Sequence, residues 1–210
     1  MHPYSVDTDE RVIVAFWLAL LSLVPTWGLQ EILAFYGFPL PWYVCAPSTL
    51  TFYLFFWLIF NRWLWKWQTL HTVGLIKTPD ISGAWHGFLQ SSYDKHKEEL
   101  GKKHEINMDI CQTWTSISLI LRANSSSSKS EGASLNTRSS DGPLIVYQYL
   151  NEPGFGALDT MAIHRGTTLL KYDALKGILN GDYYTGRGRE NYGMIHLEKG
   201  EEITPEETLQ

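Results

Sequence analysis

The stretch Pro79-Asp80-Ile81-Ser82-Gly83-Ala84-Trp85-His86-Gly87 divides the chain into two parts of different composition. Proline fixes φ and ends a preceding helix, and two glycines that bracket a large aromatic residue suit the first strand of a curved sheet. Before residue 79 there are 4 basic and 4 acidic residues and seven of the nine Trp, whereas 13 basic and 18 acidic residues and fourteen of the seventeen Gly follow. The stretch therefore predicts a boundary between an apolar segment and a β domain.

Two long uncharged runs precede this boundary, over residues 12–30 and 32–61. Roughly 20 helical residues cross a hydrocarbon core of about 30 Å, so both runs are long enough to span a membrane. Pro39 and Pro41 cannot continue a helix, which predicts a reversal of the chain there. We therefore expect a two-helix transmembrane hairpin over 11–67. The alternatives are a buried helical hairpin of a soluble bundle or, for the first run, a cleaved signal peptide.

Basic residues flank the two runs only at their outer ends. They are Arg11, Arg62, Lys66 and Lys77, and the turn between the runs has none. Because cytoplasmic flanks carry the excess of Lys and Arg, both termini are expected on the cytoplasmic side. A simple membrane anchor needs only one span, so the second span is compatible with an active role of the helices in the membrane.

Beyond residue 79 the hydrophobic period changes to two, as in half-buried strands; Ile106, Met108 and Ile110 are one example. Turn-forming residues separate the runs, and the Ser-rich segment 124–128 is expected to be a loop. About eight strands are expected, near 81–92, 104–113, 115–123, 131–139, 143–150, 160–172, 175–185 and 192–198. A closed antiparallel β-barrel is favoured over a sandwich, because closure removes exposed edges and glycines permit the bends. Such a barrel has room for side chains or for one small ligand.

The expected organisation thus has five segments. They are a cytoplasmic N-terminus at 1–10, the transmembrane hairpin at 11–67, a linker at 68–78, the β-barrel domain at 79–200 and an acidic tail at 201–210.

Composition and motifs argue against several function classes. Cys45 and Cys111 are the only cysteines, so a secreted disulfide framework is not supported. The net charge of −5 argues against binding of DNA or RNA polymers. The seven His show no zinc or HExxH spacing, and there is no P-loop, Rossmann fingerprint or nucleophile elbow. We therefore expect no metal, no cofactor, no catalytic residue and no enzyme activity.

The stretch from Leu179 to Arg189 combines aromatic, amide, hydroxyl and guanidinium groups. Aromatic rings stack on bases, amides and hydroxyls read base edges, and Arg pairs with phosphate, so this combination suits a nucleotide. The alternative is that the aromatic residues pack the core and the Arg side chains are solvated. The candidate ligand-binding residues are Trp85, Trp114, Tyr147, Asn180, Tyr184, Thr185, Arg187 and Arg189.

Two motifs, PDISGAWHGFLQSSYD at 79–94 and LNGDYYTGRGRENYGMIHL at 179–197, together with the two preceding spans, carry a family resemblance. The chain resembles the SMODS-associated two-transmembrane β-strand-rich effectors of bacterial cyclic-oligonucleotide-based antiphage signalling (CBASS). The resemblance implies that an eight-stranded barrel binds a cyclic dinucleotide made by a partner nucleotidyltransferase (CD-NTase) during phage infection. It further implies that ligand drives homo-oligomerisation and that the helices disrupt the bacterial inner membrane.

The residues alone leave two other functions open. One is a membrane-tethered, lipocalin-like carrier, which would need an apolar pocket with few polar groups. The other is a structural anchor that binds no ligand.

Overall fold

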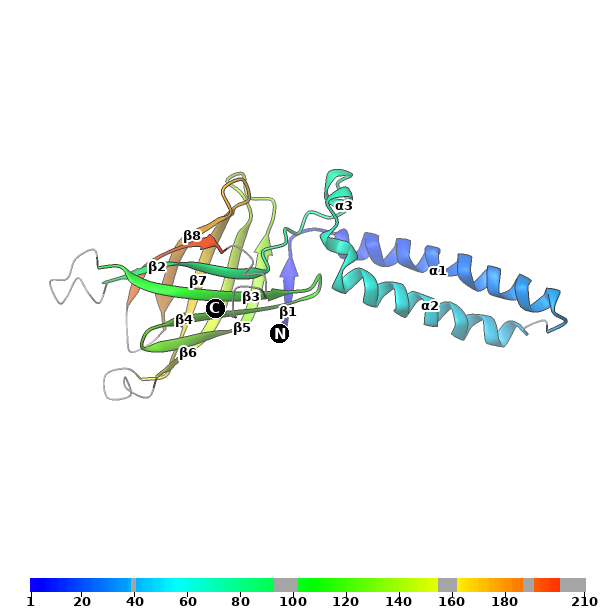
Figure 1. Ribbon diagram of the computed structural model, residues 1–210, viewed down its shortest axis with the longest axis horizontal. Helices are drawn as coiled ribbons and strands as arrows, with labels where there is room; N and C mark the ends of the chain where they lie inside the picture. Colours follow the sequence, from blue (N-terminus) through cyan, green and yellow to red (C-terminus); the bar gives the residue numbers. More distant parts are fainter. Residues whose placement is uncertain (39–40, 93–101, 155–161, 187–190, 201–210) are drawn as a thin grey trace, which may run out of the picture. The chain divides into compact units, whose positions relative to one another are not determined.

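The computed structural model describes residues 1–38, 41–92, 102–154, 162–186 and 191–200. The chain forms two compact units, which are labelled by element in Figure 1. One is a helical unit of Thr8–Lys77, and the other is a β unit that combines Met1–Asp7 with the chain from Thr78 onward. The first seven residues therefore belong to the β unit rather than to a separate N-terminal segment, and the helical unit is an insertion in the sequence of the β unit.

The helical unit contains two long helices. Its elements are α1 (Glu10–Phe35), α2 (Trp42–Arg62), the 3-10 helix η1 (Leu64–Lys66) and α3 (Gln68–Thr72). Both long helices are candidate membrane spans, with mean hydropathies of 2.1 and 1.4 over their most apolar windows. This pair of candidate spans suggests association with a membrane.

The buried residues of α1 lie four positions apart, at Glu10, Val14, Leu18, Ser22 and Thr26. A four-residue interval places side chains on one face of a helix, so α1 buries a single stripe. Large apolar side chains elsewhere on the helix, such as Phe16 and Trp17, are exposed. Helices of this kind suit a lipid environment, in which polar side chains face protein and apolar ones face the acyl chains.

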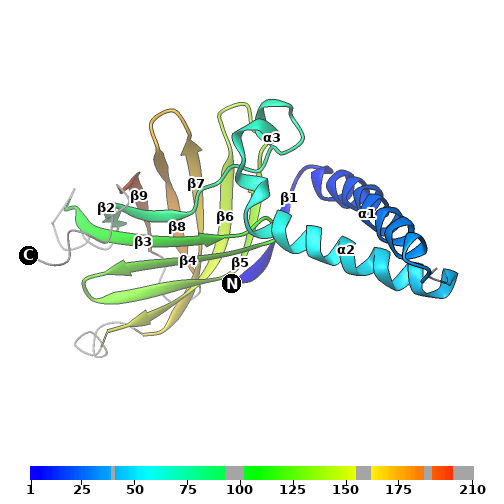
Figure 2. The ribbon, with the colours of Figure 1, turned by 45° about the vertical axis from the view of Figure 1, so that its right-hand side comes forward.

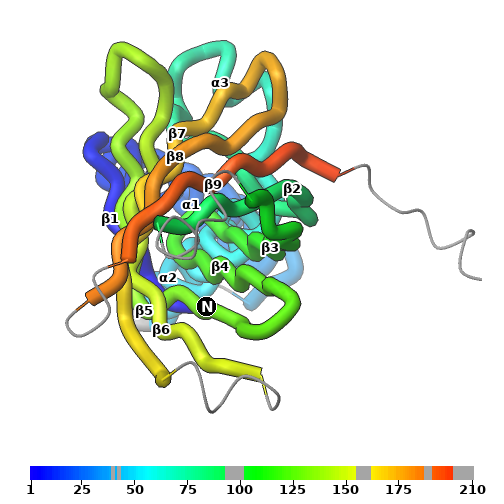
Figure 3. Tube along the Cα trace, turned by 90° about the vertical axis from the view of Figure 1, so that its left-hand side faces the viewer, coloured from blue at the N-terminus to red at the C-terminus, as the bar shows by residue number. Residues whose placement is uncertain are grey.

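In its described residues the β unit is a closed barrel of nine strands, and Figure 3 shows them following one another around a ring. The strands are β1 (His2–Val6), β2 (Gly83–Ser91), β3 (His104–Gln112), β4 (Ser116–Ala123), β5 (Ser126–Asn136), β6 (Leu144–Pro153), β7 (His164–Asp173), β8 (Ile178–Thr185) and β9 (Tyr192–Lys199). Strands β2 to β9 form an antiparallel meander, and β9 pairs with β2 to close it. The expected β-barrel is confirmed.

Three details differ from the sequence-based prediction. Strand β1 is an additional strand, and it runs parallel to β5, so the barrel is mixed rather than purely antiparallel. In addition, Ser126, Ser127 and Ser128 are not a loop but pair with β4 and β6, and only Asn124 and Ser125 form the turn. Serine favours turns, but pairing with strands on both sides overrides this local preference here.

Candidate functional site

The two ends of the barrel differ in their chain connections. The first strand, β1, leads through Asp7 into the helical unit, and the chain returns from it at Thr78 to enter β2. Both connections lie at the end of the barrel where β2, β4, β6 and β8 begin, which we call the linked end. The opposite end, where these strands finish, is called the free end.

The interior near the linked end is filled with apolar side chains. Its fully buried members include Trp85, Ile110, Leu170, Leu179 and Leu197. The indole nitrogen of Trp85 donates a hydrogen bond to the carbonyl oxygen of Ile81 at 3.0 Å, so its polar group has a partner within the fold. This half of the interior is a packed core.

On the wall of β5 to β8, polar and aromatic side chains replace the aliphatic ones toward the free end, whereas the facing wall keeps the buried aliphatic residues Ile106, Leu121 and Ile195 there. The inward-facing positions of β6 show the change: Ile145 is followed by Tyr147, Tyr149 and Asn151, all at most 6% exposed. The tyrosine rings lie 6.3 Å apart, and the hydroxyl of Ser128 donates to Asn151 Oδ1 at 3.3 Å. The free end therefore presents rings, hydroxyls and an amide on one inner wall.

Two glycines, one on β7 and one on β9, make room for tyrosine rings of an adjacent strand. A Cβ atom on Gly166 would lie 2.3 Å from the hydroxyl oxygen of Tyr149, its partner across β6 and β7. Similarly, a Cβ on Gly193 would lie 2.6 Å from the ring of Tyr183, its partner across β8 and β9. Because any larger residue would collide with the ring, glycine is required at both positions. The two rings therefore lie over glycines on the barrel wall.

The phenol of Tyr147 is buried near the middle of β6, at the linked-end side of this wall. Burial raises the pKa of Tyr147 to about 12, and a hydrogen bond with Thr168 opposes this only in part. Thr168, on β7 directly opposite Tyr147, is itself 1% exposed. Tyr147 is therefore a neutral hydrogen-bonding group at physiological pH.

Hydrogen bonds tie strand termini together at the free end. The backbone nitrogen of Thr185 donates to the carbonyl oxygen of Asn191 at 2.9 Å, and Asn191 N donates back to Thr185 Oγ1 at 2.8 Å. The backbone nitrogen of Gly186 donates to the carbonyl oxygen of Arg165 at 2.7 Å. The ends of β8 and β9 are thus held at a fixed separation and attached to β7.

The structure separates the sequence-based candidate residues into four groups. Tyr147 faces inward near the middle of β6 and Thr185 faces inward at the free end of β8, whereas Trp85 belongs to the linked-end core. Trp114 lies between β3 and β4 at the linked end, where it is fully buried. The other four candidates are Asn180, Tyr184, Arg187 and Arg189.

Two of these four, Asn180 and Tyr184, alternate with the inward residues of β8 and face outward. Tyr184 is 51% exposed, and Asn180 Oδ1 is hydrogen bonded to Nδ1 of His196 on β9. The last two candidates, Arg187 and Arg189, lie outside the described residues, in the segment that joins β8 to β9. The structure therefore groups only Tyr147 and Thr185 with the polar inner wall.

Residues that the sequence analysis did not select complete this wall. They are Ser128, Tyr149, Asn151, His164, Thr168 and Tyr183. The ring of His164 lies 6.4 Å from that of Tyr149 in an edge-on arrangement. Their shared signal in the sequence is position: Tyr147, Tyr149 and Asn151 are two residues apart and must face the same side of a strand.

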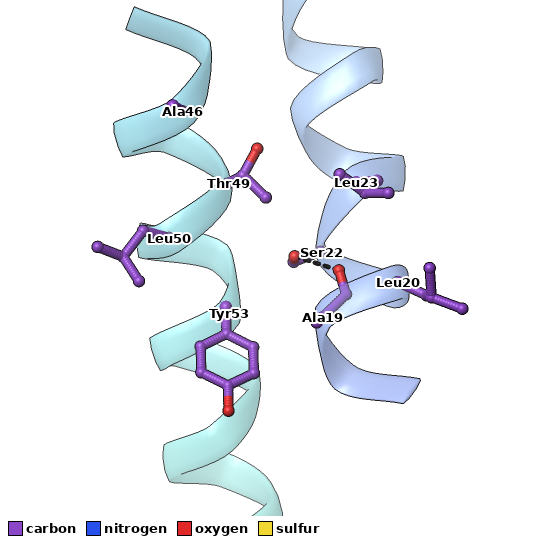
Figure 4. A pocket seen from close by; sticks show the side chains of 8 residues that line it. All are labelled: Ala19, Leu20, Ser22, Leu23, Ala46, Thr49, Leu50 and Tyr53. Carbon is purple, nitrogen blue, oxygen red and sulfur yellow. Dashed lines mark hydrogen bonds between the residues drawn. The ribbon is translucent and has the colours of Figure 1, made fainter. Parts of the chain in front are cut away.

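A separate groove of about 540 Å³ lies between α1 and α2, lined by Ala19, Leu20, Ser22, Leu23, Ala46, Thr49, Leu50 and Tyr53 (Figure 4). Its lining is mainly apolar. The hydroxyl groups of Ser22 and Thr49 donate to carbonyl oxygens of their own helices, at 2.6 and 3.1 Å. This groove therefore has little to offer an anionic ligand. Within the part of the chain that the structure describes, no cluster of three or more His, Cys, Asp or Glu could hold a metal ion.

A family model described as "Cap15, cyclic dinucleotide receptor domain" matches residues 76–199, more than half of the chain. The chain belongs to this family. CD-NTase-associated protein 15 from Yersinia aleksiciae is 29% identical over 132 residues, which cover 62% of this chain and 60% of that protein. The match thus spans less than two thirds of this relative's length. The resemblance to CBASS effectors is confirmed by these matches, and the description of the family is that of a receptor.

Proposed function

We propose that this chain is a CBASS effector whose barrel binds a cyclic dinucleotide at its free end. The observation that carries this proposal is the inner wall of Tyr149, Asn151, Thr168 and Tyr183, which combines rings for stacking on bases with an amide and hydroxyls for their edges. Membership of a family of cyclic dinucleotide receptors supports it. A carrier of apolar ligands would instead need few polar groups in the interior, whereas the wall of β5 to β8 places several at the free end.

The phosphates of the ligand require cationic partners. Arg187 and Arg189 stand between β8 and β9 in the sequence, and the strands that flank them end and begin at the free end. Guanidinium groups pair with phosphate oxygens through two parallel hydrogen bonds. We therefore retain both Arg residues as proposed phosphate ligands, together with Tyr147 and Thr185 from the first set of candidates.

The membrane step completes the proposed mechanism. Binding promotes homo-oligomerisation, and the paired helices then disrupt the bacterial inner membrane, with both termini in the cytoplasm. The candidate spans and the basic residues at their outer ends support this part. Because a ligand shifts an equilibrium only by its difference in affinity, the cyclic dinucleotide must bind the oligomeric state more tightly than the resting one.

Calorimetric titration of the full chain in detergent tests the ligand class. The probes are 3′,3′-linked cyclic dinucleotides with all pairings of adenine, guanine, cytosine and uracil, and fatty acids serve as the comparison. We expect one cyclic dinucleotide to bind, and Asn151→Ala and Arg187→Ala each to weaken it about tenfold, equivalent to about 1.4 kcal/mol. Asn180→Ala, on the outer surface, is the matched control and should bind normally. Binding of fatty acids alone would contradict the proposal.

A further inference from the structure

Strand β1 fills a gap in the barrel wall. Strands β4 and β5 pair with each other only near the free end, from Ile120 opposite Lys129 to Ala123 opposite Ser126. Toward the linked end β1 takes over: its first two residues pair antiparallel with β4 and its last three pair parallel with β5. Figure 2 shows β1 next to these two strands. It is the one described strand outside the continuous meander of β2 to β9.

Side chains in the middle of β1 and just after its last residue hold it in this gap. Tyr4 is 4% exposed within the core, and its hydroxyl accepts a hydrogen bond from Gln112 at 3.3 Å. The Asp7 carboxylate accepts hydrogen bonds from the backbone nitrogens of Thr137 and Arg138 at 2.9 and 3.0 Å. Burial opposes ionisation of Asp7, but these hydrogen bonds lower its pKa overall, so it is charged at neutral pH.

The connection from β1 to the helical unit is short. Three residues separate Val6, the last of β1, from Glu10, the first of α1, and a fully extended chain spans no more than about 14 Å across them. The other connection, between α2 and β2, comprises residues 63–82 and contains η1 and α3. Because this connection is so short, even a small displacement of β1 relative to the rest of the barrel would pull on α1.

One residue joins β1 to the proposed ligand site. Ser130 Oγ lies 2.8 Å from Nε2 of His2 and accepts a hydrogen bond from the backbone nitrogen of Leu119 at 2.9 Å. The same residue pairs directly with Tyr149 across β5 and β6, next to a register shift between Ser130 and Gly132. Ser130 thus stands where β4, β5 and β1 meet and where the aromatic wall of the free end begins.

We propose that β1 is the coupling element: occupation of the free end by a cyclic dinucleotide shifts β1 within the gap between β4 and β5, and this shift acts on α1. This inference rests on the proposed function. It differs from coupling through the longer connection before Pro79, which would leave β1 stationary. For the shift to follow from binding, the ligand must favour the displaced arrangement of β1.

A reversible cross-link tests whether β1 must move. Ser5 and Ser134 lie opposite each other on the outer side of β1 and β5, so Ser5→Cys with Ser134→Cys can be oxidised to a disulfide. The full chain also carries Cys45→Ala and Cys111→Ser, so that no other thiol competes. It is placed in phosphatidylethanolamine–phosphatidylglycerol vesicles that contain a fluorescent dye, with the tightest-binding cyclic dinucleotide of the panel as the probe.

We expect the oxidised protein to bind this cyclic dinucleotide within twofold of the reduced protein and to lose at least 90% of the dye release, which a reductant restores. A disulfide between Gln148→Cys and Thr167→Cys, opposite each other on β6 and β7, is the control and should leave release unchanged. Equal release from the oxidised and reduced Ser5–Ser134 pair would overturn the inference. A reduced protein that neither binds nor releases dye would instead contradict the proposed function.

A second pair of variants needs no disulfide. Four residues, Gly-Ser-Gly-Ser, are inserted either between Thr8 and Asp9 or between Thr78 and Pro79. Both proteins should bind the cyclic dinucleotide, but the first insertion should reduce dye release at least tenfold more than the second, because it gives slack to the β1 connection. Equal losses, or a larger loss from the insertion before Pro79, would overturn the inference.

Discussion

The two halves of the barrel interior are built from the same alternating strands but from different side chains. Near the linked end the inward positions carry mainly large aliphatic residues and Trp85. Near the free end, β5 to β8 carry tyrosines, small hydroxyl residues and Asn151, while Ile106, Leu121 and Ile195 keep the facing wall aliphatic. The linked-end half also buries Gln112, whose amide is hydrogen bonded to the backbone nitrogen of Ile81 and to the Tyr4 hydroxyl, whereas the free-end wall of β5 to β8 gathers several buried polar groups beside aromatic rings. Under the proposed function, the linked-end half stabilises the fold and the free-end wall of β5 to β8 recognises the ligand.

The largest expected effect comes from removing a side chain of the linked-end core. Trp85→Ala should lower the free energy of unfolding by about 3–5 kcal/mol, because it deletes a fully buried indole in contact with Tyr172. Denaturant titration of the full chain in detergent measures this change. If the variant kept its stability and lost binding of the cyclic dinucleotide instead, the assignment of roles to the two halves would be reversed.

The next effect concerns the glycines beneath the tyrosine rings. Gly193→Ala places a Cβ atom 2.6 Å from the Tyr183 ring and 2.0 Å from the carbonyl oxygen of Gln90. Overpacking of this kind costs about 1–3 kcal/mol of stability, and the displaced ring should weaken binding more than tenfold.

The control for this variant lies on β5. Gly132→Ala has no neighbouring atom within 4 Å of the added methyl group, so it should leave both stability and binding unchanged. Thermal denaturation and calorimetry compare the two variants. Similar binding by both would show that the position of Tyr183 does not matter for recognition.

The third effect uses pH to probe the boundary between the halves. An unfolded tyrosine ionises near pH 10, but Tyr147 in the fold keeps its proton to about pH 12. Because the pKa of Tyr147 is raised in the fold, its protonated phenol contributes fully to the free energy of unfolding below pH 10. This contribution is lost as the pH rises toward 12. The loss is about 1.4 kcal/mol per pH unit at most.

Tyr147→Phe should remove this part of the decline, so the difference between wild type and variant isolates the phenol from other alkaline groups. Free energies of unfolding measured at pH 9, 10, 11 and 12 give the two profiles. Parallel profiles would show that Tyr147 ionises as freely in the fold as in the unfolded chain.

The smallest effect is expected on the outer surface. Tyr184→Phe removes a hydroxyl from a half-exposed ring and should change neither stability nor binding by a measurable amount. Tyr149→Phe removes the same group from the inner wall and should weaken binding. Calorimetry on this matched pair shows whether the cyclic dinucleotide binds on the inner or the outer face of the barrel. Weaker binding by Tyr184→Phe would indicate a site on the outer face.

Much of the fold was predictable because it depends on local patterns. Two uncharged runs indicated the long helices, and the two-residue period with turns between the runs indicated the strands β2 to β9. Strand β1 was missed because it has five residues, includes Pro3 and pairs with residues such as Ile117 and Ala133 that are more than 100 positions away. No local pattern reports a partner at that distance.

The candidate site was less predictable, because residues were chosen by chemical type rather than by face. Asn180 and Tyr184 have suitable groups for a nucleotide, but they lie an odd number of positions from Thr185 and so face the opposite side of β8. Strand alternation alone could have separated them. Which inward positions lie at the free end, however, depends on the pairing of all the strands, and the sequence does not contain that information in local form.

The insertion of the helices between β1 and β2 also has a consequence for biosynthesis. Strand β1 leaves the ribosome first, yet its partners in β4 and β5 are made more than 110 residues later, after both candidate spans. The gap in the barrel wall can therefore be filled only after the hairpin has been synthesised and the β4–β5 segment has emerged. Completion of the barrel thus follows synthesis of both candidate spans, so a chain released early has the helices without a finished barrel.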